Sequence, residues 1–164
     1  MPISRVDKDL AAHTMTVVAE YDAPVERVWQ LYADPRQLER FWGPPTWPAT
    51  VGDHDLRPGG RVTYVMTGPD GDTSGGYWDV LEVDAPRRFV VDDGFADTAG
   101  QPNTELPTTR MELELAERDG GGTTMTIRST FPSTEAMQQM IEMGMEEGLR
   151  EAMGQIDGVL AEAA

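Results

Sequence analysis

The sequence predicts an α+β fold: a short strand, two short helices, an antiparallel sheet and a long C-terminal helix, in that order. Three observations support this class. Apolar residues alternate in 13–21, proline-led helical segments follow, and the chain after Pro132 carries a helical period towards its end. No repeat or linker divides the 164 residues. We therefore expect a single domain over 13–164, preceded by a flexible N-terminal arm over 1–12.

The two short helices are predicted from the residues at their starts. Pro24 suits the first turn of a helix, because the N–H that proline lacks would have no partner there. Asp34 is a natural N-cap for the second helix, with Pro35 at its first position and Gln37 completing a capping box. The sequence therefore predicts a pair of helices directly after the first strand.

The middle of the chain has the pattern of antiparallel strands with one buried face. Alternating apolar and polar residues, separated by turns rich in glycine, proline and aspartate, predict about six to seven strands in all. The clearest segments are 61–67, 76–83, 89–92, 111–117 and 124–129. Residues 93–107 form the longest irregular stretch, and we expect a loop there that serves as a lid.

The last segment predicts one helix of about thirty residues with a single apolar face. The residues on that face are Met137, Ile141, Met145, Leu149, Ala152, Ile156, Val159 and Leu160. Gly148 lies within the apolar face and Gly144 at its margin. Because glycine is unfavourable inside a helix, these two positions either let the sheet pack closely or leave room for a ligand.

Composition excludes several classes of function. The formal net charge of −16 makes nucleic acid and anionic membrane surfaces unfavourable partners. The absence of cysteine removes disulfides, thiolate nucleophiles and cysteine metal sites, and fits a reducing compartment. No apolar run is long enough to span a membrane, and no secretory core follows the N-terminus. We therefore expect a soluble, cytoplasmic protein.

Few residues are candidates for catalysis. The sequence has no glycine-rich phosphate loop, serine elbow or dinucleotide fingerprint. The two histidines, His13 and His54, are far apart and do not form a zinc site. Only Tyr64 and His54 are plausible inward-facing acid–base groups, and no residue at recognisable spacing orients His54. We therefore predict no catalytic residue, no metal and no cofactor.

Several spaced motifs carry a resemblance to a known family. They run in order along the chain: Asp22-Ala23-Pro24, Val28-Trp29, Phe41-Trp42-Gly43-Pro44, Pro58-Gly59-Gly60 and Gly144-Met145-Glu146-Glu147-Gly148. With them, residues 13–160 resemble the stand-alone bacterial members of the heat-shock-protein ATPase activator homologues, in the START-like (SRPBCC) superfamily. The resemblance implies a helix-grip fold, in which a curved antiparallel sheet wraps around the C-terminal helix and encloses an apolar cavity. We expect the chain to lack the separate chaperone-binding N-terminal domain of the eukaryotic co-chaperone, which weakens a chaperone role.

The predicted ligand-binding residues lie on the inward faces of the strands, on the apolar helix face and near the second short helix. They are Trp42, Trp47, Tyr64, Met66, Trp78, Met111, Leu113, Met125, Ile127, Ser129, Ile141, Met145, Gly148 and Leu149. Aromatic side chains offer contact area with a polar handle, and methionine adapts to irregular ligands. Trp42 and Trp47 either roof the entrance or cover the sheet edge, and Tyr64, Ser129 or a donor from a loop would orient the ligand.

The leading hypothesis is that the protein binds a hydrophobic or aromatic small molecule between the sheet and the last helix, without defined catalysis. One alternative is an enzyme of the polyketide cyclase or hydrolase kind, using Tyr64 or His54. Another is a co-chaperone-like interaction protein that stimulates a heat-shock-protein ATPase. The sequence allows either a monomer or a homodimer.

Overall fold

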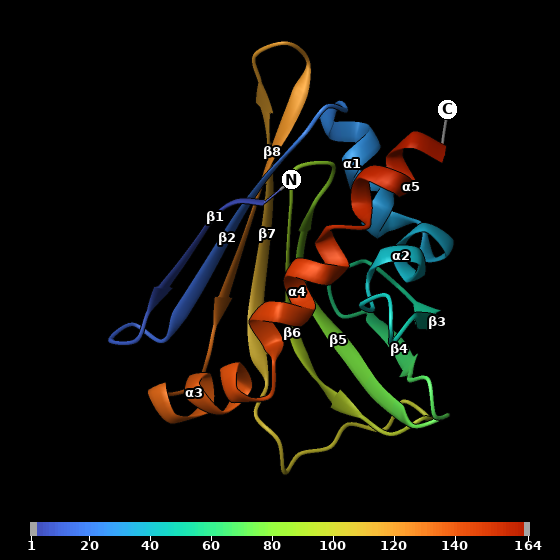
Figure 1. Ribbon diagram of the computed structural model, residues 1–164, viewed down its shortest axis with the longest axis vertical. Coiled ribbons are helices and arrows are strands. Elements are labelled where there is room, and N and C mark those ends of the chain that lie inside the picture. Colours follow the sequence, from blue (N-terminus) through green and yellow to red (C-terminus); the bar gives the residue numbers. More distant parts are fainter. Residues whose placement is uncertain (1–2, 163–164) are drawn as a thin grey trace.

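The computed structural model describes residues 3–162 and is built on one antiparallel sheet of eight strands, ordered β1-β2-β8-β7-β6-β5-β4-β3 (Figure 1). The strands are β1 Ile3–Asp9, β2 Thr14–Tyr21, β3 Ala49–His54, β4 Arg61–Thr67, β5 Thr73–Asp84, β6 Arg88–Ala96, β7 Thr109–Arg118 and β8 Gly122–Thr130. The helices are α1 Val25–Ala33, α2 Pro35–Phe41, α3 Thr134–Glu142, α4 Met145–Met153 and α5 Ile156–Glu162. The predicted α+β class is confirmed, with more strands than expected.

The additional strand is β1, which occupies most of the predicted flexible arm. It is an edge strand that pairs antiparallel with β2, from Ile3 opposite Ala19 to Asp9 opposite Thr14. Its side chains are mainly exposed, and only Ile3 and Val6 contact the core. Backbone hydrogen bonds therefore hold a segment that lacks an apolar alternation, which corrects the prediction for these residues. Residues 1–2 of that arm and 163–164 of the predicted domain lie outside the described residues.

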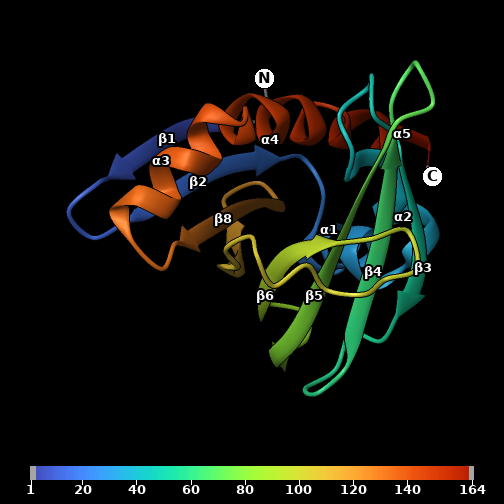
Figure 2. The same cartoon turned by 90° about the horizontal axis from the view of Figure 1, so that it is seen from below.

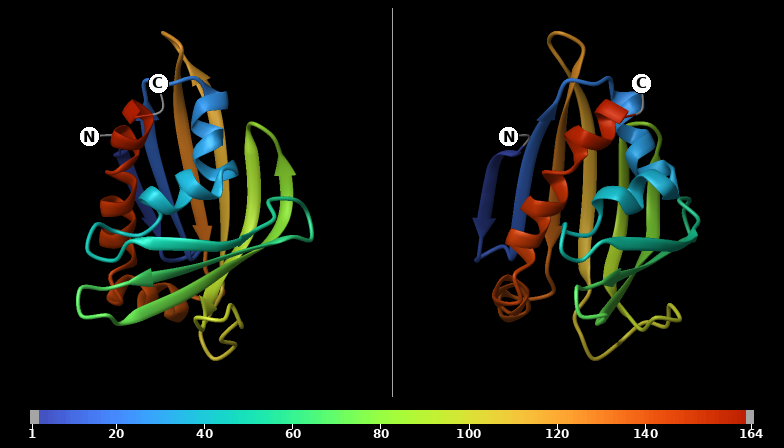
Figure 3. Two further views of the ribbon diagram at one scale, coloured as in Figure 1. Left: turned by 90° about the vertical axis from the view of Figure 1, so that its right-hand side faces the viewer. Right: turned by 45° about the vertical axis from the view of Figure 1, so that its right-hand side comes forward.

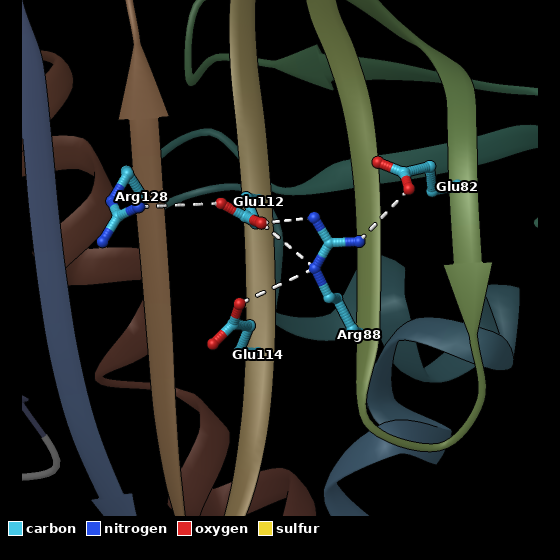
Figure 4. Close-up of polar contacts among 5 residues, drawn as sticks. All are labelled: Glu82, Arg88, Glu112, Glu114 and Arg128. Carbon is cyan, nitrogen blue, oxygen red and sulfur yellow. Dashed lines mark hydrogen bonds and ion pairs between the residues drawn. The ribbon is translucent and has the colours of Figure 1, made fainter.

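The sheet bends so that its two ends approach the C-terminal helices from opposite sides (Figure 2). Its inner face carries a continuous apolar core that also takes in α1 and α2. Its outer face carries charged side chains. Figure 4 shows Arg88 of β6 between Glu82, Glu112 and Glu114, with Arg128 on the far side of Glu112. The sheet thus has one apolar and one ionic face, as the alternation predicts.

The start of α2 follows the prediction in part. The Asp34 side chain accepts a hydrogen bond from the backbone N–H of Arg36 at 2.9 Å, with Pro35 in the first turn. Gln37, however, donates from Nε2 to the Asp34 carboxylate at 3.0 Å instead of closing a capping box on the backbone. The N-cap is therefore confirmed and the capping box is wrong. Helix α2 packs against β3 and α5.

The predicted single C-terminal helix is divided into α3, α4 and α5, and α3 turns away from the line of α4 (Figure 3). The break between α3 and α4 lies at Gly144, whose φ of 89° is a left-handed conformation that glycine adopts without strain. None of the helices among residues 3–162 is long and apolar enough to span a membrane. The break places the first turns of α4 over the inner face of the sheet.

Candidate ligand-binding cavity

A cavity of about 330 Å³ lies between the inner face of the sheet and helices α3 and α4. Five neighbouring strands, β4 to β8, form one wall, and the two helices with the segment after α2 form the other. The lining residues are Trp42, Pro44, Tyr64, Met66, Ser74, Asp93, Gly94, Phe95, Thr109, Met111, Ile127, Ser129, Met140, Met143, Gly144, Met145, Gly148, Leu149 and Ala152. Binding sites for small molecules are typically pockets of about 300–1,000 Å³. Most of their lining is apolar, and a few polar groups fix the orientation of the ligand.

The main polar feature of the sheet wall is a hydrogen bond between two strands that are not neighbours. The Tyr64 hydroxyl on β4 donates to Asp93 Oδ1 on β6 at 2.8 Å. Gly76 lies opposite Tyr64 on the intervening strand β5, and a Cβ there would lie 2.2 Å from the tyrosine ring. The missing side chain of Gly76 therefore allows the Tyr64 ring to cross β5 and reach the carboxyl group.

This pair lies in an electrostatic environment that favours its uncharged forms. Burial raises the pKa of Asp93 to about 7, although the hydrogen bond from Tyr64 acts in the opposite direction. Burial, and then the nearby Asp93, raises the pKa of Tyr64 well above its usual value. None of the described residues that line the cavity is basic. A carboxyl group thus faces an apolar space without a cation.

Aromatic packing supports the end of the cavity near α2. The Trp42 ring meets Tyr64 edge-on at 5.8 Å and Trp78 at 4.9 Å between centroids. Trp78 is fully buried and also packs against Phe89, with a centroid distance of 5.6 Å. Edge-to-face aromatic pairs of this kind are favourable. Trp42 therefore lines the cavity while Trp78 supports it from behind.

The helix wall differs from the sheet wall in its packing. A Cβ placed on Gly148 would meet no atom within 4 Å. The close-packing interpretation of this glycine is therefore wrong, and the alternative of open space agrees with the structure. The neighbouring side chains are flexible and incompletely buried, with Met143 55% exposed. They are Met140, Met143, Met145 and Leu149.

Nine of the fourteen predicted positions lie on the wall of this cavity, where their binding of a ligand remains a prediction. They are Trp42, Tyr64, Met66, Met111, Ile127, Ser129, Met145, Gly148 and Leu149. Ser129 stands opposite Met111 in the pairing of β7 with β8, so both project to the same face. Alternation along the strands was a sufficient signal for the five strand positions, and helical periodicity indicated the three on α4.

The remaining five positions are elsewhere. Trp78, Leu113 and Met125 are core residues, and Met125 Sδ accepts a hydrogen bond from the Tyr32 hydroxyl at 3.4 Å. Ile141 packs against the core on α3 without lining the cavity. Trp47 lies over Gly68, where a Cβ would come within 2.6 Å of its ring, so it covers the end of β4. Trp78, Leu113 and Met125 therefore have the predicted inward orientation, but they are buried in the core and do not line the cavity.

Sequence reasoning missed Asp93, the one carboxylate among the described residues that line the cavity. The sequence predicts that Asp93 begins the irregular segment 93–107, whereas β6 continues to Ala96. Asp93 follows Phe89 and Val91 at intervals of two, so the same alternation would have placed it inward. Of the predicted lid 93–107, residues 93–95 line the cavity and 96–107 do not, and the role of the segment as a lid stays a prediction.

Other candidate chemistry lies apart from the cavity. The His54 Nε2 atom is 2.8 Å from the carbonyl oxygen of Tyr32, and His54 does not line the cavity. This placement removes His54 as an inward acid–base group. Among residues 3–162, no group of three or more histidine, aspartate or glutamate side chains is placed to hold a metal ion.

Comparison with solved structures identifies close relatives. A crystal structure of a protein from Mycobacterium smegmatis is 54% identical, with a TM-score of 0.90 and 97% of each chain covered. A solution NMR structure of a protein from Arthrobacter aurescens is also 54% identical, with a TM-score of 0.90, covering 98% of this chain and 92% of that one. A Staphylococcus epidermidis protein is similar at 28% identity and a TM-score of 0.84, covering 98% and 96%.

No curated protein matches the sequence. The family described as "Activator of Hsp90 ATPase homolog 1-like protein" matches residues 22–161, which is most of the chain. This range holds α1 to α4, all of α5 except its last residue, and every residue that lines the cavity. The motifs, the helix-grip architecture and this match agree, and the chain belongs to the Activator of Hsp90 ATPase homolog 1-like family of the START-like (SRPBCC) superfamily.

Proposed function

We propose that the protein binds a hydrophobic or aromatic small molecule in the cavity between its sheet and helix α4. The open space at Gly148 is the observation that carries this proposal. No atom would contact a Cβ there, although the position faces a wall of apolar side chains. A well-packed interior leaves few voids of this size, and filling an apolar void contributes about 25 cal/mol per Å² of buried apolar surface.

The composition of the wall supports a ligand that is apolar over most of its surface. Methionine side chains contribute to both walls, and their flexible thioethers adapt to irregular shapes. The hydroxyl groups of Thr109 and Ser129 and the pair formed by Tyr64 and Asp93 are the polar groups that could fix its orientation. This arrangement matches the general plan of a small-molecule site.

A fluorescence titration with naphthylethanol tests the proposal. We expect the wild type to bind the probe and the Gly148→Leu variant to bind at least tenfold more weakly, because the new side chain occupies the cavity. Gly158→Leu is the matched control: Gly158 is an exposed glycine of α5, a Cβ at this position would meet no atom within 4 Å, and it does not line the cavity. Equal affinity in all three proteins would overturn the proposal.

A second candidate is acid–base catalysis on a bound aromatic substrate. The position of Asp93 favours it, since a carboxyl group with a pKa of about 7 is suited to proton transfer near neutral pH. Hydrolysis of the ester naphthyl acetate is a direct assay. Enzymatic turnover that is lost in Asp93→Asn, with probe binding retained, would support this function. Equal rates in wild type and variant would exclude Asp93 from the reaction.

The family description supplies a third candidate, stimulation of an Hsp90-type ATPase. Only the family assignment favours it. An ATPase assay with a bacterial Hsp90-type chaperone tests it directly. A rate increase that saturates with this protein would support the co-chaperone function, and an unchanged rate would count against it.

A further inference from the structure

One carboxyl oxygen of Asp93 has no hydrogen-bond partner in the part of the chain that the structure describes. Oδ1 accepts the hydrogen bond from Tyr64, whereas Oδ2 accepts no hydrogen bond from any residue among 3–162. The carboxyl group lies on the cavity wall beside Gly94 and Phe95. A hydrogen-bond acceptor that is unpaired and partly removed from water costs free energy. A hydrogen-bond donor on a ligand would reduce that cost.

Within residues 3–162, no cationic side chain lines the cavity to compensate this group. Tyr64 is the sole other titratable side chain that lines the cavity within the described residues. Helices α3 and α4 present methionine, glycine, leucine and alanine to the space, and the neighbouring strands β5 and β7 add Ser74, Thr109 and Met111. Nearby Arg110 is engaged on the outer face, where its Nε donates to Asp92 at 3.0 Å.

We propose that the ligand of this cavity is an apolar or aromatic molecule carrying one basic nitrogen, which pairs with Asp93 while Tyr64 holds the carboxyl group in place. This inference rests on the proposed function of the cavity and specifies the class of ligand. A protonated amine supplies both the missing hydrogen-bond donor and the missing positive charge. An anionic ligand would meet an uncompensated carboxyl group and a chain of net charge −16.

The pairing makes a specific prediction about pH. The free carboxyl group is half protonated near pH 7, because burial raises its pKa to about 7. An ammonium ion pairs with the ionised form, so affinity for an amine falls as pH decreases below that value. Tyr64, whose pKa is raised well above its usual value, stays protonated throughout this range. Affinity for a neutral ligand of the same shape should not fall in this way.

Three probes of similar shape separate the possibilities: the amine naphthylethylamine, the alcohol naphthylethanol and the carboxylate naphthylacetate. We expect the amine to bind at least tenfold more tightly than the alcohol at about pH 8, because charge-assisted hydrogen bonds are the stronger kind. The carboxylate should bind most weakly. The advantage of the amine should decrease about tenfold for each pH unit below the pKa of Asp93, which is about 7.

The outcomes distinguish this inference from the proposed function. If the alcohol and the carboxylate bind as well as the amine, the cavity binds aromatic molecules but the amine preference is wrong. If none of the three probes binds, both the cavity function and the inference are overturned. These comparisons use the wild-type chain alone, so they do not depend on whether a variant folds.

A substitution at Asp93 then tests whether this residue causes the preference for the amine. Asp93→Asn keeps the shape and a hydrogen-bonding group, and it should retain naphthylethanol binding within about threefold while losing the preference for the amine and its pH dependence. Asp92→Asn is the matched control, because it makes the same change at a neighbouring carboxylate that pairs with Arg110 and does not line the cavity, and it should keep both. An amine preference that survives in Asp93→Asn would contradict the assignment.

Discussion

The two walls of the cavity are built in different ways. On the sheet wall, Gly76 leaves only the space that the Tyr64 ring occupies, and Trp78 is fully buried behind it. On the helix wall, Gly148 faces open space and the nearby methionines are incompletely buried. The sheet wall is therefore a packed scaffold, whereas the helix wall has room for additional atoms. The difference indicates which side would adapt when a ligand binds.

Removing a large side chain from behind the sheet wall and another from the helix wall should give the largest contrast. Trp78→Ala deletes a fully buried ring that contacts Trp42 and Phe89. We expect it to lower the free energy of unfolding by about 3–5 kcal/mol. Leu149→Ala, at a partly buried position on the cavity wall, should cost less than about 1 kcal/mol. Urea denaturation measures both, and similar losses would mean that the two walls are packed alike.

Adding one methyl group to each wall should produce effects of opposite sign. In Gly76→Ala the new Cβ lies 2.2 Å from Tyr64, so the ring must move and the variant should lose about 1–3 kcal/mol of stability. Gly148→Ala places its methyl group in open space within a helix and should gain about 0.5–1 kcal/mol. Thermal unfolding checks the signs. A stabilised Gly76→Ala protein would contradict the tight packing of the sheet wall.

The sheet wall also carries the titratable group that should make stability depend on pH. The pKa of Asp93 is raised from 3.8 in the unfolded reference to about 7 in the folded protein. The folded state therefore binds the proton more strongly, and this contribution to stability is lost as pH rises from about 4 to about 7. The slope is at most about 1.4 kcal/mol per pH unit.

Asp93→Asn isolates this contribution. The difference in unfolding free energy between wild type and variant should decline across that pH range and be constant above it. Chemical denaturation at several pH values measures this difference. Asp34 and Glu146 have lowered pKa values and make stability depend on pH in the opposite direction. Because wild type and variant share these two groups, their contributions cancel in the difference. A difference that does not change with pH would mean that the carboxyl group is not buried as described.

The smallest expected effect concerns the outer side of the helix wall. Lys8 of β1 donates to Glu146 of α4 at 2.6 Å, and Arg150 contacts the same carboxylate at 3.2 Å. Exposed ion pairs contribute about 0.2–1 kcal/mol. We expect Lys8→Ala to cost no more than this, and the cost should vanish in high salt. A larger, salt-independent loss would indicate that β1 positions α4 by other contacts.

Periodicity was a reliable guide wherever burial alternates along a strand. Met111, Ile127 and Ser129 lie on the cavity wall as alternation alone predicts, because the sheet fixes which side chains share a face. The same rule could not separate the cavity wall from the core behind it. Leu113 and Met125 point to the inner face but are covered by other residues, and that depth depends on contacts between distant segments.

Features that depend on the backbone or on tertiary contacts were harder to predict. The apolar period continues past Gly144, so nothing in it marks the break between α3 and α4. The segment Ile3–Asp9 lacks alternation and is a strand because β2 offers an unpaired edge. The pairing of Tyr64 with Asp93 depends on Gly76, a residue on a third strand, and a sequence pattern does not indicate which glycine a side chain will cross.

NMR of the methionine methyl groups tests the central claim most directly, because methionines lie both at the cavity and in the core. Those at the cavity are Met66, Met111, Met140, Met143 and Met145. Those buried in the core are Met15, Met125, Met137 and Met153. On titration with naphthylethylamine, we predict that the first set shifts together and the second set changes little. Larger shifts in the core set, or none in the cavity set, would contradict binding in this cavity.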